Sequence, residues 1–245
     1  MTWNIAAGSG GLPAIAAVIR TARPDVVALQ EVDVHWSERS AFADQAADLG
    51  SALGMQVRFG PIYRLPGAAA APLREFGLAI LSRHPIVEFR NHVIPRLSTQ
   101  ATTTEPEPLP GFLEAAVQVD GSRVRVFNTH LDYRADSRVR ALQVAAMLEL
   151  MSRTEGPLVL MGDLNAPPAA AELQPLFSRL RDVWGERDGA DPGSTYPAAA
   201  PVRRIDYILT SPGLRAHDAH VLPVQASDHR PVVASVEMTS GVVSK

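Results

Sequence analysis

The sequence predicts a single α/β domain over residues 1–245, in which mixed β-sheets combine with helices. Apolar and polar residues alternate on both sides of Asp120-Gly121, which indicates a hairpin of two antiparallel strands. A helix-like segment also precedes a short apolar run, as in crossovers between strands. No internal repeat or long polar linker divides the sequence. With 245 residues, 46% of them apolar, the chain can bury a large core.

Three segments have the apolar spacing of amphipathic helices. In the first, Leu12, Ile15 and Ile19 share one helical face. Proline disfavours continuation of a helix, and glycine commonly follows a helix C-terminus. The expected helices therefore run from Leu12 to a stop at Arg23-Pro24, from Phe42 to Leu53 before Gly54, and from about Ser137 to Arg153.

Short apolar runs predict the buried strands. These runs are residues 26–29, 78–81, 158–161, 205–209 and 232–236, in addition to the hairpin arms near residues 117–119 and 124–126. Residues 2–5 have the character of the end of another strand. Two segments rich in Pro, Ala or Thr lack any period, so we expect loops at residues 66–72 and 98–111.

Composition excludes several classes of function. The net charge is −3 and 20% of residues are charged, so a polycationic nucleic-acid coat and an acidic disordered tail are both disfavoured. The sequence contains no cysteine, which excludes disulfides, a thiol nucleophile and thiolate metal sites. Any bound metal ion must therefore be held by oxygen or imidazole ligands.

The sequence contains no membrane-spanning run and no signal-peptide pattern, so we expect no stable insertion into a membrane. As the chain stands, a cytoplasmic location is expected. The strand-like residues directly behind Met1 leave open an exported protein whose signal has been removed. The sequence makes no prediction of oligomeric state.

Polar residues able to bind a metal ion stand at the ends of several predicted strands. Asn4 follows the first strand and Glu31 the second, whereas His130 follows the hairpin. Asp163 ends a further strand, and Asp228-His229 precedes the last one. Because strand ends in α/β proteins converge on one rim, we expect these side chains to meet. Carboxylate and amide oxygens suit a hard cation, which favours Mg²⁺, with Mn²⁺ as a plausible substitute.

Seven short motifs follow one another between residue 3 and about residue 236. They are Trp3-Asn4-Ile5, Leu29-Gln30-Glu31, Ala79-Ile80-Leu81-Ser82-Arg83, Asn128-Thr129-His130-Leu131, Gly162-Asp163-Leu164-Asn165, Arg204-Ile205-Asp206-Tyr207 and Ser227-Asp228-His229. In this order they resemble the motifs of the endonuclease/exonuclease/phosphatase (deoxyribonuclease I-like) superfamily, and the sequence is similar to its compact bacterial members. The resemblance implies a four-layer sandwich of two packed mixed β-sheets flanked by α-helices. It also implies hydrolysis of a phosphoester with a divalent cation.

The resemblance also implies a role for each site residue. Glu31 matches the main metal ligand, with Asn4 beside it and Asp228 near the metal. Among the expected catalytic residues, Asp163 orients or deprotonates the attacking water and Asn165 contacts the phosphate. His229 steadies the phosphoryl oxygens and is paired with Asp206, and His130 is the second histidine of the site.

Three positions depart from the family pattern. Ala6, Leu78 and Phe112 stand where relatives often have aspartate, asparagine and arginine, respectively. The resemblance therefore implies fewer fixed polar contacts to the phosphate. Three polar residues are candidates to replace the missing phosphate contacts: Arg74, Glu75 and Glu114. Either of the two glutamates is also a candidate to orient His130.

The preferred substrate is a small or headgroup-like phosphodiester. Affinity for a nucleic acid depends largely on Lys and Arg, whereas this chain is slightly acidic and only 6% aromatic. A DNA or RNA endo- or exonuclease stays the first alternative, because several arginines are candidates to gather at the rim: Arg64, Arg74, Arg134, Arg203 and Arg204. The second alternative is a catalytically silent binding protein of the same fold.

Overall fold

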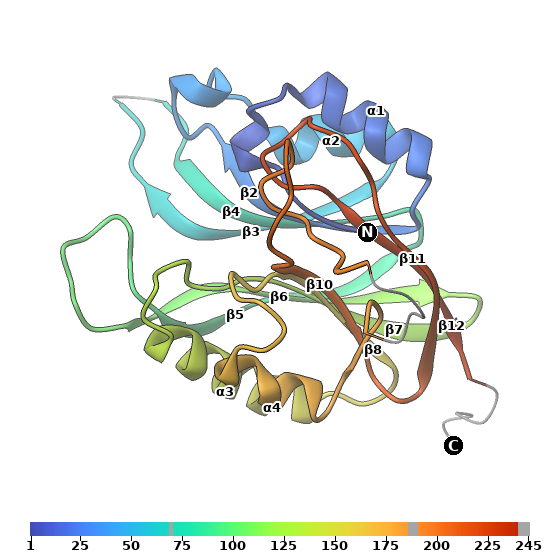
Figure 1. Cartoon of the computed structure of the whole chain (residues 1–245). Coiled ribbons are helices and arrows are strands. Elements are labelled where there is room, and N and C mark those ends of the chain that lie inside the picture. Colours follow the sequence, from blue (N-terminus) through green and yellow to red (C-terminus); the bar gives the residue numbers. More distant parts are fainter. Residues whose placement is uncertain (69–70, 186–190, 240–245) are drawn as a thin grey trace.

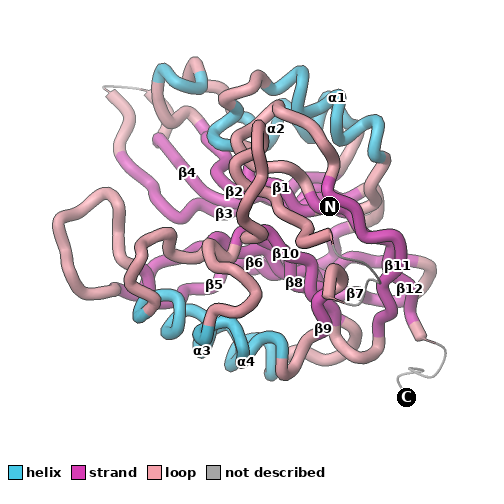
Figure 2. The backbone as a smooth tube through the Cα atoms, in the orientation of Figure 1, coloured by secondary structure: helices cyan, strands magenta, loops and turns pink. Residues whose placement is uncertain are grey.

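The computed structural model describes residues 1–68, 71–185 and 191–239, which form two six-stranded β-sheets packed face to face. Helices lie on both outer faces (Figure 1). The arrangement of helices, sheet, sheet and helices is the four-layer sandwich that the family resemblance implies (Figure 2). The helices over the first sheet are α1 (Leu12–Ala22) and α2 (Gln45–Leu53), and those over the second are α3 (Arg138–Ser152) and α4 (Gln174–Phe177).

The first sheet is mixed. In spatial order its strands are β11 (Leu214–Val221), β12 (Val232–Met238), β1 (Thr2–Asn4), β2 (Val26–Val34), β4 (Arg74–Ser82) and β3 (Gln56–Leu65). β1 and β2 run parallel, and the other neighbours run antiparallel. The parallel pair requires a crossover, which α1 provides on the outer face.

The second sheet is mixed in the same way. In spatial order its strands are β5 (Ile86–Arg96), β6 (Glu107–Val119), β7 (Ser122–His130), β8 (Leu158–Asp163), β10 (Asp206–Thr210) and β9 (Arg181–Asp182). β7 and β8 run parallel, with α3 as their crossover. The hairpin predicted at Asp120-Gly121 joins β6 to β7. Three short 3-10 helices complete the described elements: Ala6–Gly8, Glu38–Ser40 and Ala171–Leu173.

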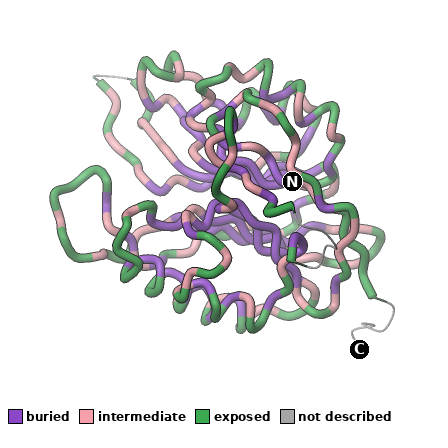
Figure 3. The backbone as a smooth tube through the Cα atoms, viewed as in Figure 1, coloured by how far each residue is buried: buried purple, intermediate pink, exposed green. Residues whose placement is uncertain are grey.

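Three clusters of buried apolar side chains lie between the four layers. Buried residues concentrate on the strands where the two sheets face each other (Figure 3). Successive residues of a strand point to opposite faces, so Ala28 packs between the sheets while Leu29 packs beneath the helices of the first sheet. The central strands are covered on both faces, which explains why their sequences are continuous apolar runs rather than alternating ones. On the second sheet, Met147 of α3 belongs to the same cluster as Phe127.

A buried amide links the two sheets. The Nδ2 of Asn128, on β7, donates hydrogen bonds of 2.9 Å to the carbonyl oxygens of Leu29 and Ala79 in the first sheet. Its Oδ1 accepts from the Nε2 of Gln30 at 2.8 Å. Asn128 and Gln30 are fully buried, so these bonds fix the two sheets relative to each other at the strands that carry the predicted site.

The three predicted helices match α1, α2 and α3 except at the start of α2, whereas α4, at four residues too short to show a helical period, is not predicted. The Oδ1 of Asp44 accepts a hydrogen bond from the backbone N–H of Ala47, which makes Asp44 the N-cap and places Phe42 outside the helix. Phe42 has a positive φ of 52° and is half exposed. Among the helices of the described ranges, none combines the length and apolar character needed to cross a bilayer.

The strand prediction misses β3, β5, β9 and β11, and it places the start of β6 too late. These four strands are the edges of the two sheets. An edge strand exposes one row of backbone groups and part of its side chains, so its sequence lacks a continuous apolar run. β6 begins at Glu107, inside the segment expected to be a loop, because its first residues pair only with edge strand β5.

Candidate active site

Strand pairing brings together three predicted site residues on the second sheet. His130 ends β7, Asp163 ends β8, and Asp206 begins β10. In the ladder, His130 lies opposite Asp163, which in turn lies opposite Asp206. Residues paired in this way present their side chains on the same face of a sheet. The register of β7, β8 and β10 therefore places one carboxylate between a histidine and a second carboxylate.

Glu31 lies within a strand, not after it as the apolar run suggested. β2 continues to Val34, and its pairing with β4 shifts between Leu29 and Val32. Glu31 has a φ of 54° at this irregularity. A β-bulge re-aims one side chain without ending the strand, and such bulges are common next to active sites. The bulge explains how a residue in the middle of β2 reaches the rim of the sandwich.

Asn4, the last residue of β1, connects the two halves of the site. Its Nδ2 donates to the Oε1 of Glu31 at 2.9 Å and to the Oδ2 of Asp163 at 3.1 Å. Its Oδ1 accepts from the backbone N–H of Ala6 at 3.0 Å, which holds the amide in this orientation. One amide group thus binds a carboxylate from each sheet, and Glu31 and Asp163 belong to one cluster.

Asp163 is the centre of that cluster. Its Oδ2 lies 3.6 Å from the Nε2 of His130 and 3.7 Å from the Nε2 of His229. Its Oδ1 accepts from the backbone N–H of Asn165 at 2.9 Å. Burial, followed by the charge of Asp206, raises the pKa of the Asp163 carboxyl against the opposing effect of the two histidines and Asn4. A raised pKa makes its carboxylate a stronger base.

His229 forms a buried pair with Asp206. The His229 Nδ1 lies 2.9 Å from the Oδ2 of Asp206, and the Thr195 hydroxyl donates to the same oxygen at 2.5 Å. Burial disfavours the His229 cation, but the charge and hydrogen bond of Asp206, with the charges of Asp163 and Asp228, outweigh burial and raise its pKa to about 10. His229 is therefore protonated at neutral pH, with Nδ1–H donating to Asp206.

His130 has the opposite charge state. Burial lowers its pKa, and the charges of Arg96 and His229 lower it further, against the opposing effect of Asp163 and Asp132. The His130 imidazole is therefore neutral at neutral pH. Asp163 lies between one neutral and one cationic histidine.

The two remaining predicted residues lie at the edge of the cluster. The Nδ2 of Asn165 donates to the carbonyl of Leu131 at 3.0 Å, and Asn165 has a positive φ of 52° two residues after Asp163. Asp228 is exposed. Its Oδ1 accepts from the hydroxyl of Ser227 at 3.3 Å, and its charge acts on His229. The structure brings Asp228 to the histidine, and no described contact joins it to Glu31.

Two groupings of these residues offer ligand atoms for a metal ion. Ligand atoms of Asp163, Asp206 and His229 lie within 4.8 Å of one another. His229 is protonated at neutral pH and bonded to Asp206, however, so its imidazole is a hydrogen-bond donor there and not a ligand. Glu31 and Asp163, on either side of Asn4, provide the oxygen donors that hard divalent cations prefer. The second grouping fits the cation expected from the sequence.

Two residues of the site carry no signal in the sequence. Thr195 bonds Asp206, and the ring of Tyr196 lies 4.8 Å from that of His229. Both lie in an irregular segment between β9 and β10, where no period or motif marks a function. Their role depends on an isolated bridge of Tyr196 to Arg203, a pairing that is visible only in the folded chain.

The residues expected to compensate for missing phosphate contacts have other partners. Glu75 pairs with Arg64 at 2.6 Å. Glu114 is buried and pairs with His92 at 2.7 Å and with Arg125 at 3.2 Å. Neither glutamate contacts His130 in the described part of the chain. The Nε of Arg74 donates to the carbonyl of Trp36 at 2.6 Å, alongside the edge of the first sheet.

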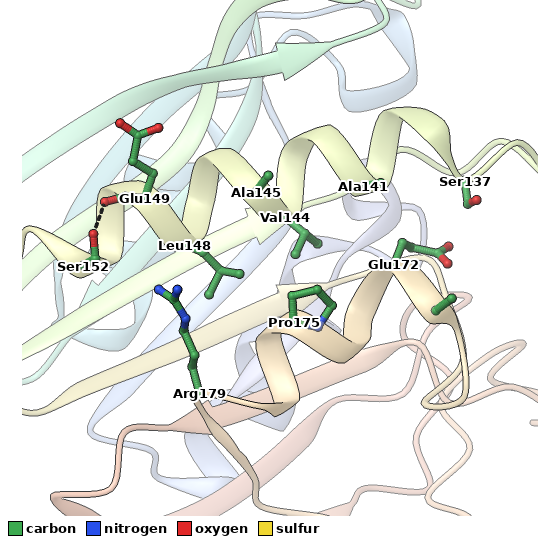
Figure 4. A pocket seen from close by; sticks show the side chains of 11 residues that line it. Ser137, Ala141, Val144, Ala145, Leu148, Glu149, Ser152, Glu172, Pro175 and Arg179 are labelled. Carbon is green, nitrogen blue, oxygen red and sulfur yellow. Dashed lines mark hydrogen bonds between the residues drawn. The ribbon is translucent and has the colours of Figure 1, made fainter.

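A larger cavity lies away from the candidate site. It has a volume of about 770 Å³ and is an open groove between α3 and α4 (Figure 4). Val144 and Leu148 of α3 point toward Pro175 of α4 across it, with Arg179 at one end. None of the predicted site residues lines this groove, so size alone does not mark the functional site of this protein.

Comparison with solved structures finds the same four-layer fold in proteins of distant sequence. An endonuclease/exonuclease/phosphatase protein from Beutenbergia cavernae is 26% identical, with a TM-score of 0.74 over 99% of this chain and 72% of that chain. A mannosyl-6-phosphatase from Bacteroides thetaiotaomicron is 19% identical, with a TM-score of 0.74 over 97% of this chain and 98% of that chain. The human Nocturnin catalytic domain, solved with a sulfate anion, is 22% identical, with a TM-score of 0.72 over 97% of this chain and 92% of that chain.

A sequence model of a known family covers the whole candidate site. The model of the Endonuclease/Exonuclease/phosphatase family matches residues 1–229, a range that begins before Asn4 and ends at His229. Members of this family are generally phosphoesterases or nucleases. The resemblance inferred from the seven motifs is confirmed: the chain belongs to the endonuclease/exonuclease/phosphatase family.

Proposed function

We propose that the protein is a divalent-metal-dependent phosphoesterase that hydrolyses a small or headgroup-like phosphodiester by attack of an activated water molecule. One observation carries the proposal. The amide of Asn4 holds Glu31 of the first sheet and Asp163 of the second together, beside a cationic His229. Hydrolysis of an anionic ester requires charge neutralisation and a positioned water, and this group of side chains supports both.

Asp163 is proposed to orient and deprotonate the water. Its Oδ1 is held by the backbone of Asn165, which leaves Oδ2 facing the two histidines. Its raised pKa favours proton uptake by the carboxylate. Asn165 is proposed to contact the phosphate, with its amide fixed by the carbonyl of Leu131.

His229 is proposed to stabilise charge on the phosphoryl oxygens. Its Nδ1–H is bonded to Asp206, so its Nε2–H is the donor that faces the cluster. The bond to Asp206 keeps the ring oriented and cationic, which prepares it for charge that develops during the reaction. His130 is neutral and lies on the other side of Asp163, where it is proposed to be the second histidine of the site.

Glu31 is the proposed main ligand of a divalent cation, with Asn4 and Asp228 nearby. Mg²⁺ is the preferred ion and Mn²⁺ a substitute, because the available donors are oxygens. When bound, such a cation neutralises phosphate charge and activates water. As a ligand, Asn4 would turn its amide oxygen toward the cation, whereas it now turns its NH₂ group toward both carboxylates.

The preference for a small substrate rests on charge. The chain carries a net charge of −3, which disfavours a long polyanion. The name of one structural relative, a mannosyl-6-phosphatase, supports adding a hexose 6-phosphate to the substrate panel. The panel therefore compares plasmid DNA, single-stranded DNA, RNA, sphingomyelin, inositol phosphates and a hexose 6-phosphate.

Hydrolysis of bis(p-nitrophenyl) phosphate tests the proposal. We expect turnover with Mg²⁺ or Mn²⁺ that is abolished by a chelator. Asp163→Asn should lower kcat by about 100-fold or more, because it removes the base. The matched control is Asp48→Asn on the exposed face of α2, which should leave kcat unchanged. Full activity of Asp163→Asn, or no turnover of any phosphoester by folded protein, contradicts the proposal; the second result favours a silent binding protein.

A further inference from the structure

A small cavity adjoins the proposed catalytic cluster on the side of Glu31 and His130. Its volume is about 170 Å³, and both residues line it. The lining also includes the rings of Tyr63 and Phe76, which stack with their centroids 6.2 Å apart. The Tyr63 hydroxyl accepts from the backbone N–H of Thr99, which ties the edge of the first sheet to the loop after β5. The cavity is thus bounded by both sheets.

Arg96, the last residue of β5, places a buried positive charge in the lining of this cavity. It is 7% exposed. Its Nη1 donates to the carbonyl of His130 at 2.9 Å and its Nη2 to that of Gly111 at 2.7 Å. Its Nε has no hydrogen-bond partner, and no carboxylate forms an ion pair with it, among the residues that the structure describes. Burial lowers its pKa to about 10, so it stays cationic at neutral pH.

The backbone around Arg96 makes room for its side chain. Gly111 has a φ of +125°, and a Cβ at this position would lie 2.9 Å from both the Nε and the Nη2 of Arg96. A side chain at residue 111 would therefore displace the guanidinium. Burying a cation without a counter-ion is unfavourable, by several kcal/mol in real proteins. A fold that nevertheless holds such a charge beside a reactive cluster suggests that a ligand supplies the missing anion.

Asp132 also lines the cavity, and its charge raises the pKa of Arg96, but its carboxylate forms its ion pair with Arg134. The Nη1 of Arg134 pairs with the Oδ2 of Asp132 at 2.5 Å. Glu31 is the proposed ligand of the divalent cation. Arg96 is thus the cation in this lining without a negative partner among the described residues.

We infer that this cavity binds a second anionic group of the substrate, a phosphate or a carboxylate, next to the phosphoester that is hydrolysed. The inference rests on the proposed function and narrows its substrate class. The volume is below the 300–1,000 Å³ that drug-sized ligands occupy, so the cavity accepts a small charged group and not a polymer. Arg96 binds the group through its charge, and Tyr63 and Phe76 limit its size.

Binding of three short ligands tests the inference independently of turnover. The ligands are propyl phosphate, propane-1,3-diyl bisphosphate and 3-(phosphonooxy)propanoate, titrated by calorimetry in saturating Mg²⁺. We expect the bisphosphate, the carboxylate or both to bind the wild-type protein about tenfold more tightly than propyl phosphate. The ligand that gains affinity identifies the anionic group. Equal affinity of all three ligands overturns the inference.

Substitution of Arg96 locates the effect. Arg96→Met should remove the preference for the second anionic group, whereas Arg96→Lys should keep part of it. The matched control is Arg125→Met, which removes an arginine of the same sheet that pairs with Glu88 and should keep the full preference. A preference that survives in folded Arg96→Met overturns the inference. If that variant does not fold, a reduced preference in Arg96→Lys supports the inference, and an undiminished preference contradicts it.

Turnover is a separate readout. Release of phosphate or p-nitrophenol shows whether the protein is a phosphoesterase. A binding preference without any turnover leaves the anion site in place and contradicts the proposed function. Turnover without a binding preference supports the proposed function and contradicts the anion site.

Discussion

Asp163 lies between two histidines whose pKa values are shifted in opposite directions. His229 gains a positive charge from its pairing with Asp206, whereas His130 loses its charge through burial. One carboxylate with a raised pKa therefore faces one cation and one neutral imidazole. The two histidines therefore differ in what they can do, because the surroundings of each ring set its charge state.

The charge of His229 gives a pH-dependent prediction. Asp206→Asn removes the main cause of the raised pKa, so burial should then lower the His229 pKa from its value of about 10. If cationic His229 is required, the alkaline limb of the kcat/KM profile should move to lower pH by about one unit or more. The measurement is the pH profile of bis(p-nitrophenyl) phosphate hydrolysis. An alkaline limb at the same pH in the variant rules out this role for the pair.

The same pair contributes to stability with a defined sign. The folded-state pKa of His229 lies above the unfolded value of 6.5, so its stabilisation is complete below about pH 6.5 and is lost as pH rises through about 10. The free energy of unfolding should therefore differ most between wild type and Asp206→Asn at pH 6. This difference should shrink toward pH 10, as urea denaturation across that range can show.

At the scale of residues, the sequence predicts which side chains belong to the candidate site better than it predicts how they are arranged. Its motifs place Asn4, Glu31 and Asp163 at strand ends, and the structure brings these three together. The bulge at Glu31 and the hydrogen bond of Thr195 to Asp206 are not predictable, because both depend on strand register. The cation of Arg96 is missed for the same reason, since it comes from an edge strand.

At the scale of elements, the end of β8 requires a residue without a side chain. Gly162 has a φ of +152°, and a Cβ there would lie 2.1 Å from the carbonyl oxygen of Thr129 on β7. The backbones of β7 and β8 must approach closely for His130 and Asp163 to pair. The glycine of the Gly162-Asp163-Leu164-Asn165 motif is therefore a structural requirement of the site.

Gly162→Ala should lower the free energy of unfolding by about 3 kcal/mol, because it combines backbone strain with overpacking. Gly121→Ala is the matched control: it also has a positive φ, of +81°, but nothing lies within 4 Å of its added Cβ. The control should lose only about 1 kcal/mol. Urea denaturation of both variants makes the comparison. Equal losses would show that the close approach of the two strands is unimportant.

The prediction of elements succeeds where a strand or helix is buried on a defined face. Central strands such as β8 are apolar throughout because both their faces are covered. The four missed strands lie at sheet edges, where partial exposure removes that signal. Long α3 is found within one residue at each end, because its buried face spans the whole helix.

At the scale of the whole molecule, the candidate site depends on how the two sheets are aligned. Glu31 and Asp163 come from different sheets and meet at Asn4. The buried Asn128 fixes this alignment through two carbonyl groups of the opposite sheet. Sequence patterns alone predict mixed sheets, whereas the pairing of the sheets into four layers follows from the family resemblance. The hydrogen bonds between the sheets join residues from 30 to 159 positions apart, which no local pattern records.

Asn128→Ala should therefore lower the free energy of unfolding by about 3 kcal/mol, since it leaves the buried carbonyls of Leu29 and Ala79 without a donor. Asn91→Ala is the comparison variant. Asn91 also donates across the sheets, to the carbonyl of Pro61, but it is half-buried, so water can replace its bond and the loss should be about 1 kcal/mol. Denaturation in urea measures both losses, and an equal loss at the two positions would refute this ranking.

The most direct test of the account is the Mg²⁺ dependence of turnover in Glu31→Gln, with Glu38→Gln, an exposed residue after the same strand, as the control. If Glu31 and Asp163 form one cation-dependent site, Glu31→Gln should need about tenfold more Mg²⁺ for half-maximal activity, or lose activity altogether. Glu38→Gln should behave as wild type. A Glu31→Gln protein with the wild-type Mg²⁺ response would contradict the claim that the two sheets build a single metal-dependent centre.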